Sequence, residues 1–181
     1  MEANKNENSQ FLSTEMELEL LSQIHTLYTK CKEMFMRAEE CLPKMELFVA
    51  PLLEHRDAFD HVMRYYDRKR MGRCSTEQLL DELKEARSHE VRAFYDIADY
   101  TCILIRANIS QRLNGVSRRK IKKVWPTYGT DRANVLTKSE KLAELRSNRT
   151  GTFEGIAEYE TVVGEFYDIF KQFVKDIDPK L

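Results

Sequence analysis

The sequence has few of the residues that interrupt helices. Its 181 residues include only six glycines and four prolines. Leu, Glu, Lys, Met and Ala instead recur in long uninterrupted runs, which favour helices over turn-rich β architecture. The sequence therefore predicts an all-α protein.

Paired cysteines and long apolar runs are also absent. The four cysteines are Cys31, Cys41, Cys74 and Cys102. They have no CxxC or paired spacing, and three of them fall on predicted apolar helix faces, so we expect buried free thiols in a reducing compartment. The first residues lack a basic segment followed by an apolar core, and no apolar run approaches the ~18 residues of a membrane span. A cytoplasmic, soluble protein without a membrane partner is expected.

A charge excess of either sign is missing as well. Charged residues make up 33% of the chain, yet the formal net charge is only -1. No global field therefore draws the protein to nucleic acid or to a membrane surface. A hydrophobic content of 42% is enough for one core, so one domain is the expectation for this length.

Apolar residues recur at steps of three and four in four long segments, which predicts four main helices. We place them at residues 14–41, 51–71, 75–113 and 152–178. Capping-box patterns at residues 14–17, 75–78 and 137–140 mark helix starts, the last one opening a short helix to residue 147. An antiparallel bundle is the simplest way to bury four apolar stripes.

The remaining segments are polar and have no helical period. Residues 1–10 are predicted to be a disordered tail, and residues 11–179 a single helical-bundle domain. Within that domain residues 114–136 are predicted to be a basic, irregular loop. The second helix is expected to turn Leu52, Leu53, Phe59, Val62, Met63 and Tyr66 toward the core. The last helix carries an aromatic stripe formed by Ile156, Tyr159, Val163, Phe166, Phe170, Phe173 and Ile177.

Common catalytic signatures are not found. The chain has no Gly-x-Ser-x-Gly, no glycine-rich phosphate loop and no Cys/His arrangement typical of nucleophilic catalysis. Asp57 with His61 and Glu85 with His89 are spaced four apart, and together they could supply four ligands to a di-metal bundle site. Contacts on a helix surface explain such pairs more simply, so neither a metal site nor a cofactor is assigned.

Ionisable groups interrupt an apolar helical face at residues 54–67. Here Arg56 and Asp57 precede His61. Histidine titrates near neutrality, so it can exchange a proton with a ribose hydroxyl or a leaving oxygen. Arginine is a permanent bidentate cation that binds phosphate oxygens. A salt-bridged helix face, with Arg56 bound to Asp60 or to a neighbouring helix, is the alternative reading.

The spacing of Arg56, Asp57 and His61 resembles the Arg-x(4–6)-His motif of HEPN domains, helical domains that bind nucleotides or RNA. Many members are metal-independent endoribonucleases that act as homodimers, with the two motifs meeting across the dimer cleft. The resemblance implies His61 as acid or base, Arg56 as phosphate ligand and Asp57 as the residue that orients one of them. The best-known toxin members carry Tyr two residues after the His, where this chain has Met63.

A second candidate site is the basic run before Trp125. Its cations are Arg118, Arg119, Lys120, Lys122 and Lys123. Counterion release would give this run affinity for phosphates, and Trp125 could stack on a base. The sequence thus predicts RNA or nucleotide binding by a homodimer, with RNA cleavage through His61 and Arg56. The alternative is a non-catalytic helical module that binds a protein partner, and a di-metal bundle is third.

Overall fold

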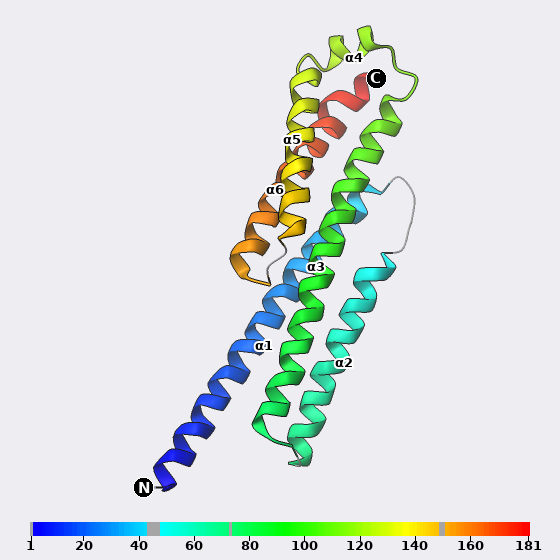
Figure 1. Ribbon diagram of the computed structural model, residues 1–181. Helices are drawn as coiled ribbons and strands as arrows, with labels where there is room; N and C mark the ends of the chain where they lie inside the picture. Colours follow the sequence, from blue (N-terminus) through cyan, green and yellow to red (C-terminus); the bar gives the residue numbers. More distant parts are fainter. Residues whose placement is uncertain (1, 43–47, 73, 149–150) are drawn as a thin grey trace. The chain divides into compact units, whose positions relative to one another are not determined.

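The structure is a computed structural model that describes residues 2–42, 48–72, 74–148 and 151–181. Its α-helices are α1 (Glu2–Cys41), α2 (Val49–Met71), α3 (Thr76–Leu113), α4 (Arg118–Val124), α5 (Tyr128–Ser147) and α6 (Phe153–Gln172), shown in Figure 1. A π-helical turn, Phe173–Ile177, and a 3-10 turn, Asp178–Lys180, complete the chain. The described residues contain no strand, which confirms the all-α prediction.

The all-helical chain, as predicted for a helical bundle, divides into two compact units. Unit 1 comprises Met1–Met34 and Leu47–Ile97, and unit 2 comprises Phe35–Glu46 and Ala98–Leu181. Helices α1 and α3 each contribute one part to each unit. The two units have separate clusters of buried side chains, which are described in turn below.

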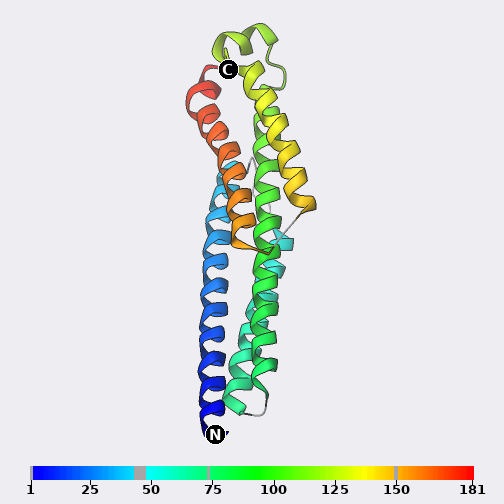
Figure 2. The same ribbon diagram turned by 60° about the vertical axis from the view of Figure 1, so that its left-hand side comes forward.

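In unit 1, α2 lies alongside the first part of α3, as both views of the ribbon show (Figures 1 and 2). The buried cluster joins side chains of α1, α2 and α3, namely Ile24, Tyr65, Leu79, Leu83 and Ala86. Two predicted boundaries of this unit are confirmed. Gly72 caps α2 with φ 62°, a left-handed conformation that favours glycine. Ser75 and Gln78 form the reciprocal capping box before α3, each side chain bonding the other residue's backbone N–H.

The predicted core face of α2 is largely wrong. Val62 packs against the unit 1 cluster, but Leu52, Leu53, Phe59, Met63 and Tyr66 are all exposed. On α2, Ala58 and Tyr65 are buried, and Glu54, His55 and His61 pair with side chains of α3. Two stripes of helical period share α2, one apolar and one polar. The carboxylate–histidine pairs with α3 turn the polar stripe toward α3. An exposed apolar stripe is therefore left on α2.

In unit 2, the predicted aromatic stripe is confirmed. Residues 156, 159, 163, 166, 170, 173 and 177 are all buried. Trp125, Phe173 and Ile177 form one cluster, in which the Trp125 and Phe173 ring centroids are 5.5 Å apart. The buried Asn108 side chain donates to the Cys41 carbonyl oxygen at 2.9 Å, which satisfies an acceptor at the end of α1.

The predicted loop over residues 114–136 is wrong, because most of it is helical. Ser117 caps α4 by accepting from the Lys120 N–H at 3.3 Å, and α5 begins at Tyr128. Burial of Ile121 and Trp125 stabilises these turns, and tertiary packing of this kind overrides the weak local pattern. Thr137 consequently lies inside α5, where its hydroxyl donates to the Ala133 carbonyl oxygen instead of capping a helix.

The predicted disordered tail over residues 1–10 is also not met, since α1 begins at Glu2. Without proline or glycine in this segment, each residue added to an existing helix gains one backbone hydrogen bond, so the helix continues through the polar residues. The capping box at Thr14 is therefore internal to α1. Across the described residues, no helix is both long enough and apolar enough to cross a lipid bilayer.

Candidate functional site

The face between α2 and α3 in unit 1 carries three carboxylate–histidine pairs. Glu54 Oε2 lies 2.8 Å from His89 Nδ1, Glu90 Oε2 lies 2.9 Å from His55 Nδ1, and Glu82 Oε2 lies 2.7 Å from His61 Nδ1. The two helices run in opposite directions, so the neighbours Glu54 and His55 meet the neighbours His89 and Glu90 crosswise. Three of the chain's four histidines thus have a carboxylate oxygen within 2.9 Å of Nδ1, and for His61 and His89 the contact is a hydrogen bond.

Two of these histidines are in contact with each other. The rings of His61 and His89 stack with centroids 5.3 Å apart and an interplanar angle of 28°. Their side chains are partly buried, with 19% and 16% of their surface exposed. A carboxylate at Nδ1 fixes ring orientation and leaves Nε2 as the atom available to a ligand. The site thus holds two stacked imidazoles, each with its Nδ1 against a carboxylate.

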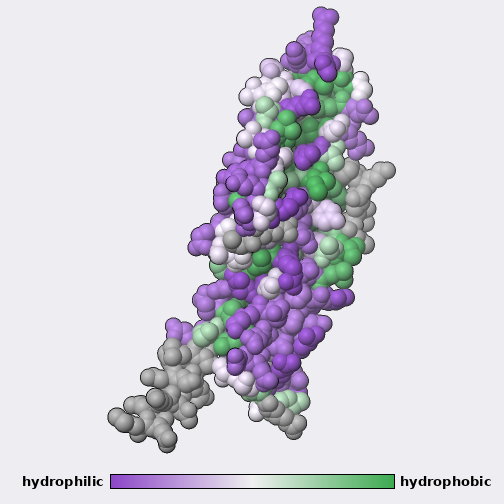
Figure 3. Space-filling view, in the orientation of Figure 1, coloured by the Kyte–Doolittle hydropathy of each residue, from purple (hydrophilic) through white to green (hydrophobic). Residues whose placement is uncertain are grey.

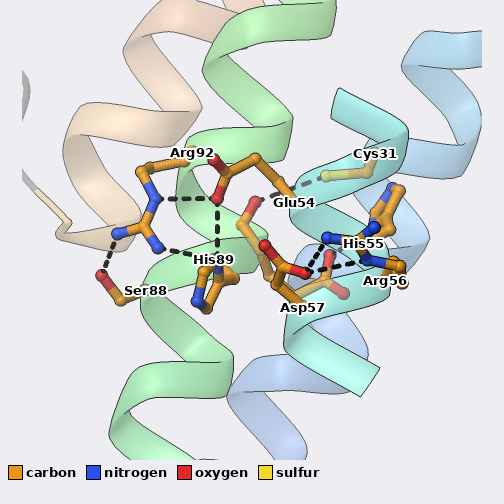
Figure 4. Close-up of polar contacts among 9 residues, drawn as sticks. Cys31, Glu54, His55, Arg56, Asp57, Ser88, His89 and Arg92 are labelled. Carbon is orange, nitrogen blue, oxygen red and sulfur yellow. Dashed lines mark hydrogen bonds and ion pairs between the residues drawn. The ribbon is translucent and has the colours of Figure 1, made fainter. Parts of the chain in front are cut away.

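Two arginines contact the carboxylates that bind His61 and His89. Arg92 Nε donates to Glu54 Oε2 at 2.8 Å, and its Nη2 lies 2.7 Å from His89 Nδ1 (Figure 4). His89 Nδ1 therefore donates to Glu54 in one tautomer and accepts from Arg92 in the other. Burial would raise the pKa of Glu54, but the hydrogen bonds and charges of Arg92 and His89 outweigh it and lower that pKa. Arg68 Nη1 contacts the second carboxylate, Glu82, at 2.6 Å.

Of the three residues in the sequence motif, His61 belongs to this cluster, and Arg56 and Asp57 bond to each other on α2. Arg56 is 64% exposed and donates from Nε and Nη2 to Asp57 Oδ1 at 3.0 and 2.7 Å, as Figure 4 shows. The hydrogen bond from Arg56 lowers the pKa of Asp57, as do the charges of Arg56, His89 and His61 in that order. Asp57 is thus within electrostatic reach of both Arg56 and the stacked histidines. Arg56 pairs with Asp57 rather than with Asp60, which instead contacts Arg64 at 3.9 Å.

The spacing that suggested a di-metal site does not describe the observed contacts. Glu82 and Glu54 are the carboxylates bound to His61 and His89, whereas Asp57 is bonded to Arg56 and Glu85 is exposed. Each histidine takes its partner from the opposite helix, not from four residues away on its own helix. The pairs Asp57–His61 and Glu85–His89 are accordingly not the contacting pairs of this face.

A second group of ligand-type side chains lies in the same unit, deeper than the stacked pair. Cys31 of α1, His55 of α2 and Glu90 of α3 have their Sγ, ring nitrogen and carboxylate oxygen within 4.8 Å of one another. Cys31 Sγ also contacts the Glu90 carbonyl oxygen at 3.6 Å, the dashed line beside Cys31 in Figure 4. Burial raises the pKa of the Cys31 thiol, and the charge of Glu90 raises it further.

The basic residues before Trp125 form α4 in unit 2, so they belong to a different unit from Arg56 and His61. Arg118, Arg119, Lys122 and Lys123 are exposed, and Lys120 contacts the Leu181 carbonyl oxygen. Trp125 is only 6% exposed, and its indole Nε1 donates to Asp131 Oδ2 at 2.6 Å. Its indole is therefore packed in the core and bonded rather than presented as a free stacking platform.

A cavity of about 580 Å³ opens in unit 2 beside α4. Its apolar wall includes Ile105, Ile109 and Trp125, and its cationic residues include Arg118 and Lys122. Figure 3 shows apolar side chains gathered on the surface between the second part of α3 and α5. Three of the predicted nucleic-acid residues, Arg118, Lys122 and Trp125, thus border an apolar cavity.

Glu54 and Glu82 were not predicted as site residues, whereas His89 was predicted only as a candidate ligand beside Glu85 and Cys31 only as a buried free thiol. The signal that could have found them is the inverted order of two adjacent pairs, Glu54-His55 in α2 and His89-Glu90 in α3. Antiparallel helices bring such inverted pairs together, but only when the register between them is known.

Comparisons of the chain with protein-family models, with curated proteins and with solved structures found no match.

Proposed function

We propose that unit 1 binds RNA or nucleotide phosphates on the α2/α3 face and cleaves RNA without a metal ion. The stacked, carboxylate-bound His61 and His89 carry this proposal. RNA cleavage by its own 2′-hydroxyl needs one group that removes a proton and one that supplies a proton. Two adjacent imidazoles meet that requirement more fully than the single histidine of the sequence motif.

The proposed cleavage uses one imidazole as a base and the other as an acid. One imidazole takes the 2′-hydroxyl proton, and that oxygen forms a bond to phosphorus. The bond from phosphorus to the 5′ oxygen breaks, and the other, protonated imidazole gives its proton to that oxygen. A 2′,3′-cyclic phosphate and a 5′-hydroxyl result. Arg56 binds the phosphate oxygens as their charge grows, and Asp57 orients Arg56 through its two hydrogen bonds.

A homodimer joined through α2 is part of the proposal. The exposed residues Leu52, Phe59, Met63 and Tyr66 recur at helical spacing, and Arg56 lies between the first two of them in the sequence. An apolar stripe of this kind is typical of an interface, and a two-fold axis there would bring two copies of Arg56 toward each other. This agrees with what the HEPN resemblance implies, namely motifs that meet across a dimer cleft.

The exposed cations of α4 are proposed as a second phosphate-binding surface. Lys122 and Lys123 stand in its last turn beside the exposed Arg118 and Arg119. Their contribution is electrostatic, so RNA binding through them weakens as salt rises. This electrostatic contribution is measured by the slope of the logarithm of RNA affinity against the logarithm of salt concentration.

The test is cleavage of a labelled single-stranded RNA in excess chelator by the wild type and by His61→Asn, His89→Asn and His25→Asn. We expect each of the first two changes to lower the rate by about 10²–10⁴-fold, the usual contribution of acid–base catalysis. His25 is exposed on α1, so His25→Asn is the matched control and should keep the full rate. A substrate with a 2′-deoxy sugar at the cleaved position should resist all four proteins, and light scattering should give the mass of a dimer.

Equal cleavage by the wild type and His61→Asn, or none by any protein, would remove the enzymatic proposal. The second candidate function, a non-catalytic module that binds a protein partner, is favoured by the same exposed stripe on α2. An inactive wild type that is monomeric and binds no RNA would support this candidate.

A further inference from the structure

Three helices of unit 1 bring ligand-type side chains to one buried point. Cys31 comes from α1, His55 from α2 and Glu90 from α3, and their candidate ligand atoms all lie within 4.8 Å of one another. In the part of the chain that the structure describes, this is the one group of three or more His, Cys, Asp or Glu side chains found that close together. The group takes no part in the acid–base chemistry proposed for His61 and His89.

Glu90 is the member of this group whose burial is unusual. Cys31 is fully buried, and 5% of the Glu90 side chain is exposed, whereas glutamate is almost never fully buried without a partner. Glu90 Oε2 makes no well-oriented hydrogen bond within the described residues, although His55 Nδ1 lies 2.9 Å from it. A buried carboxylate with poor hydrogen-bond geometry costs free energy unless a cation neutralises it. The carboxylate is therefore aimed at the same point as the thiol and the imidazole.

We propose that Cys31 Sγ, His55 Nδ1 and Glu90 Oε2 bind one divalent transition-metal ion of the Zn²⁺ type. Sulfur and nitrogen donors exclude Mg²⁺ and Ca²⁺, which prefer oxygen ligands, and a mixed set of three protein ligands is typical of zinc sites with a fourth position for water. A thiolate, a carboxylate and a neutral imidazole together carry two negative charges, which one divalent cation balances. The buried site would then be electrically neutral.

The observed spacing needs only small adjustments to hold such an ion. Zinc binds sulfur at about 2.3 Å and nitrogen or oxygen at about 2.0–2.2 Å, so neighbouring tetrahedral ligand atoms lie roughly 3.3–3.6 Å apart. The present 2.9 Å contact between His55 and Glu90 would lengthen, and the wider gaps, at most 4.8 Å, would close. We expect side-chain rotations, with the three helices in place, to make both adjustments. The Tyr28 ring packs edge-on against the His55 ring, with their centroids 5.7 Å apart. This contact holds the plane of the imidazole.

A metal ion here would join α1, α2 and α3 by three bonds. Since ligands from separate helices are far apart in the unfolded chain, the ion binds the folded state preferentially and stabilises it. The contribution would fall on unit 1, because all three ligands belong to that unit. We therefore expect added metal to raise the melting temperature of the full-length protein.

Cobalt(II) provides the direct test, since a cobalt–thiolate bond gives a charge-transfer absorption band in the near ultraviolet. Chelator-treated full-length protein is titrated with Co²⁺ and then with Zn²⁺. We expect the band to saturate at one equivalent per chain and to disappear when Zn²⁺ replaces Co²⁺. Elemental analysis after dialysis should give one zinc per chain, and Zn²⁺ should raise the melting temperature.

Variants identify the ligands. Cys31→Ser should abolish the band, while Glu90→Gln, which keeps the size of the side chain, should weaken Co²⁺ binding at least 10-fold. Cys102→Ser is the matched control, because Cys102 is also a buried thiol but lies in unit 2, and it should keep the band. Circular dichroism checks that each variant is folded.

A wild type that shows no saturable band would overturn the proposal, whatever the folding of the variants. A band that persists in folded Cys31→Ser, or that is lost in folded Cys102→Ser, would do so as well. The RNA-cleavage proposal is tested separately, because it predicts activity in chelator and does not use Cys31 or Glu90.

Discussion

The two units of this protein use the same secondary structure but different interactions between helices. In unit 1, α2 and α3 meet through carboxylate–histidine pairs, and the apolar stripe of α2 remains exposed. In unit 2, α6 and the π-helical turn that follows it bury seven apolar and aromatic residues at helical spacing, and Trp125 packs on Phe173. Unit 2 thus resembles an ordinary helical core, whereas unit 1 gives part of its interior to ionisable groups. Function is expected in an interior with ionisable groups, such as that of unit 1, because burial and pairing perturb the acid–base chemistry of those groups.

The largest effect is expected from truncation in the unit 2 core. Phe173 is fully buried against the only tryptophan of the chain, so Phe173→Ala should destabilise unit 2 by about 3–5 kcal/mol. Urea unfolding followed by Trp125 fluorescence measures this, because that signal arises from unit 2 alone. The neighbouring Val174 is 38% exposed, and Val174→Ala should cost far less. If both changes have equal effects, the unit 2 core is not organised by this stripe.

An intermediate effect is expected from the polar face of unit 1. Glu82 is a buried partner of both His61 and Arg68, so Glu82→Ala leaves His61 without its carboxylate and should cost about 1–3 kcal/mol. Glu85→Ala, three residues further along α3 on its exposed side, is the control and should change stability little. Urea unfolding followed by far-ultraviolet circular dichroism compares the two. Greater stability of Glu82→Ala would mean that the polar face is retained for activity at the expense of stability.

The smallest effect is expected from neutralising Glu54, and its size should depend on pH. Burial acts to raise the pKa of Glu54, but Arg92 and His89 lower it below its ordinary value of 4.5. A carboxyl group whose pKa is lower in the folded state contributes stability above the pKa of the unfolded chain, and that contribution is lost as pH falls through the folded value. Glu54→Gln should therefore be less stable than the wild type near neutral pH, by about 1 kcal/mol or less.

The same comparison in acid completes this prediction. The difference between Glu54→Gln and the wild type should shrink as pH falls below about 4.5, because the wild type then loses the charged Glu54 as well. Urea midpoints measured for both proteins across this range provide the check. A difference that stays constant with pH would show that Glu54 acts through packing and not through its charge.

Several features of the fold follow from local pattern alone. The end of α1 before Pro43, the Gly72 cap of α2 and the capping box at Ser75 were all predictable, because each depends on residues within one turn of the helix end. The aromatic stripe of α6 was predictable for a related reason, since only one of its faces is apolar. On α2 two faces compete, so periodicity gives no choice between Leu52 and Val62 as core residues. The helical character of residues 118–136 depends on burial of Ile121 and Trp125, which no local pattern reveals.

The candidate site was predictable only in part. Arg56, Asp57 and His61 share one helix, and their spacing was visible in the chain, but the partner predicted for Arg56 was Asp60 or a neighbouring helix rather than Asp57. His89, the second imidazole, lies 28 residues further along, and its spacing pointed to Glu85; its contact with His61 depends on the register of α2 against α3.

The sequence by itself determined that the chain is helical and where most helices begin and end, because these properties depend on residues a few positions apart. Tertiary structure alone decided which stripe of α2 faces inward, and it brought Cys31, His55 and Glu90 to one point. The physical reason is that contacts between helices depend on their register and on which face each turns to its neighbour. Those are set by the summed packing and pairing of residues distant in the chain, and no short stretch of sequence contains them.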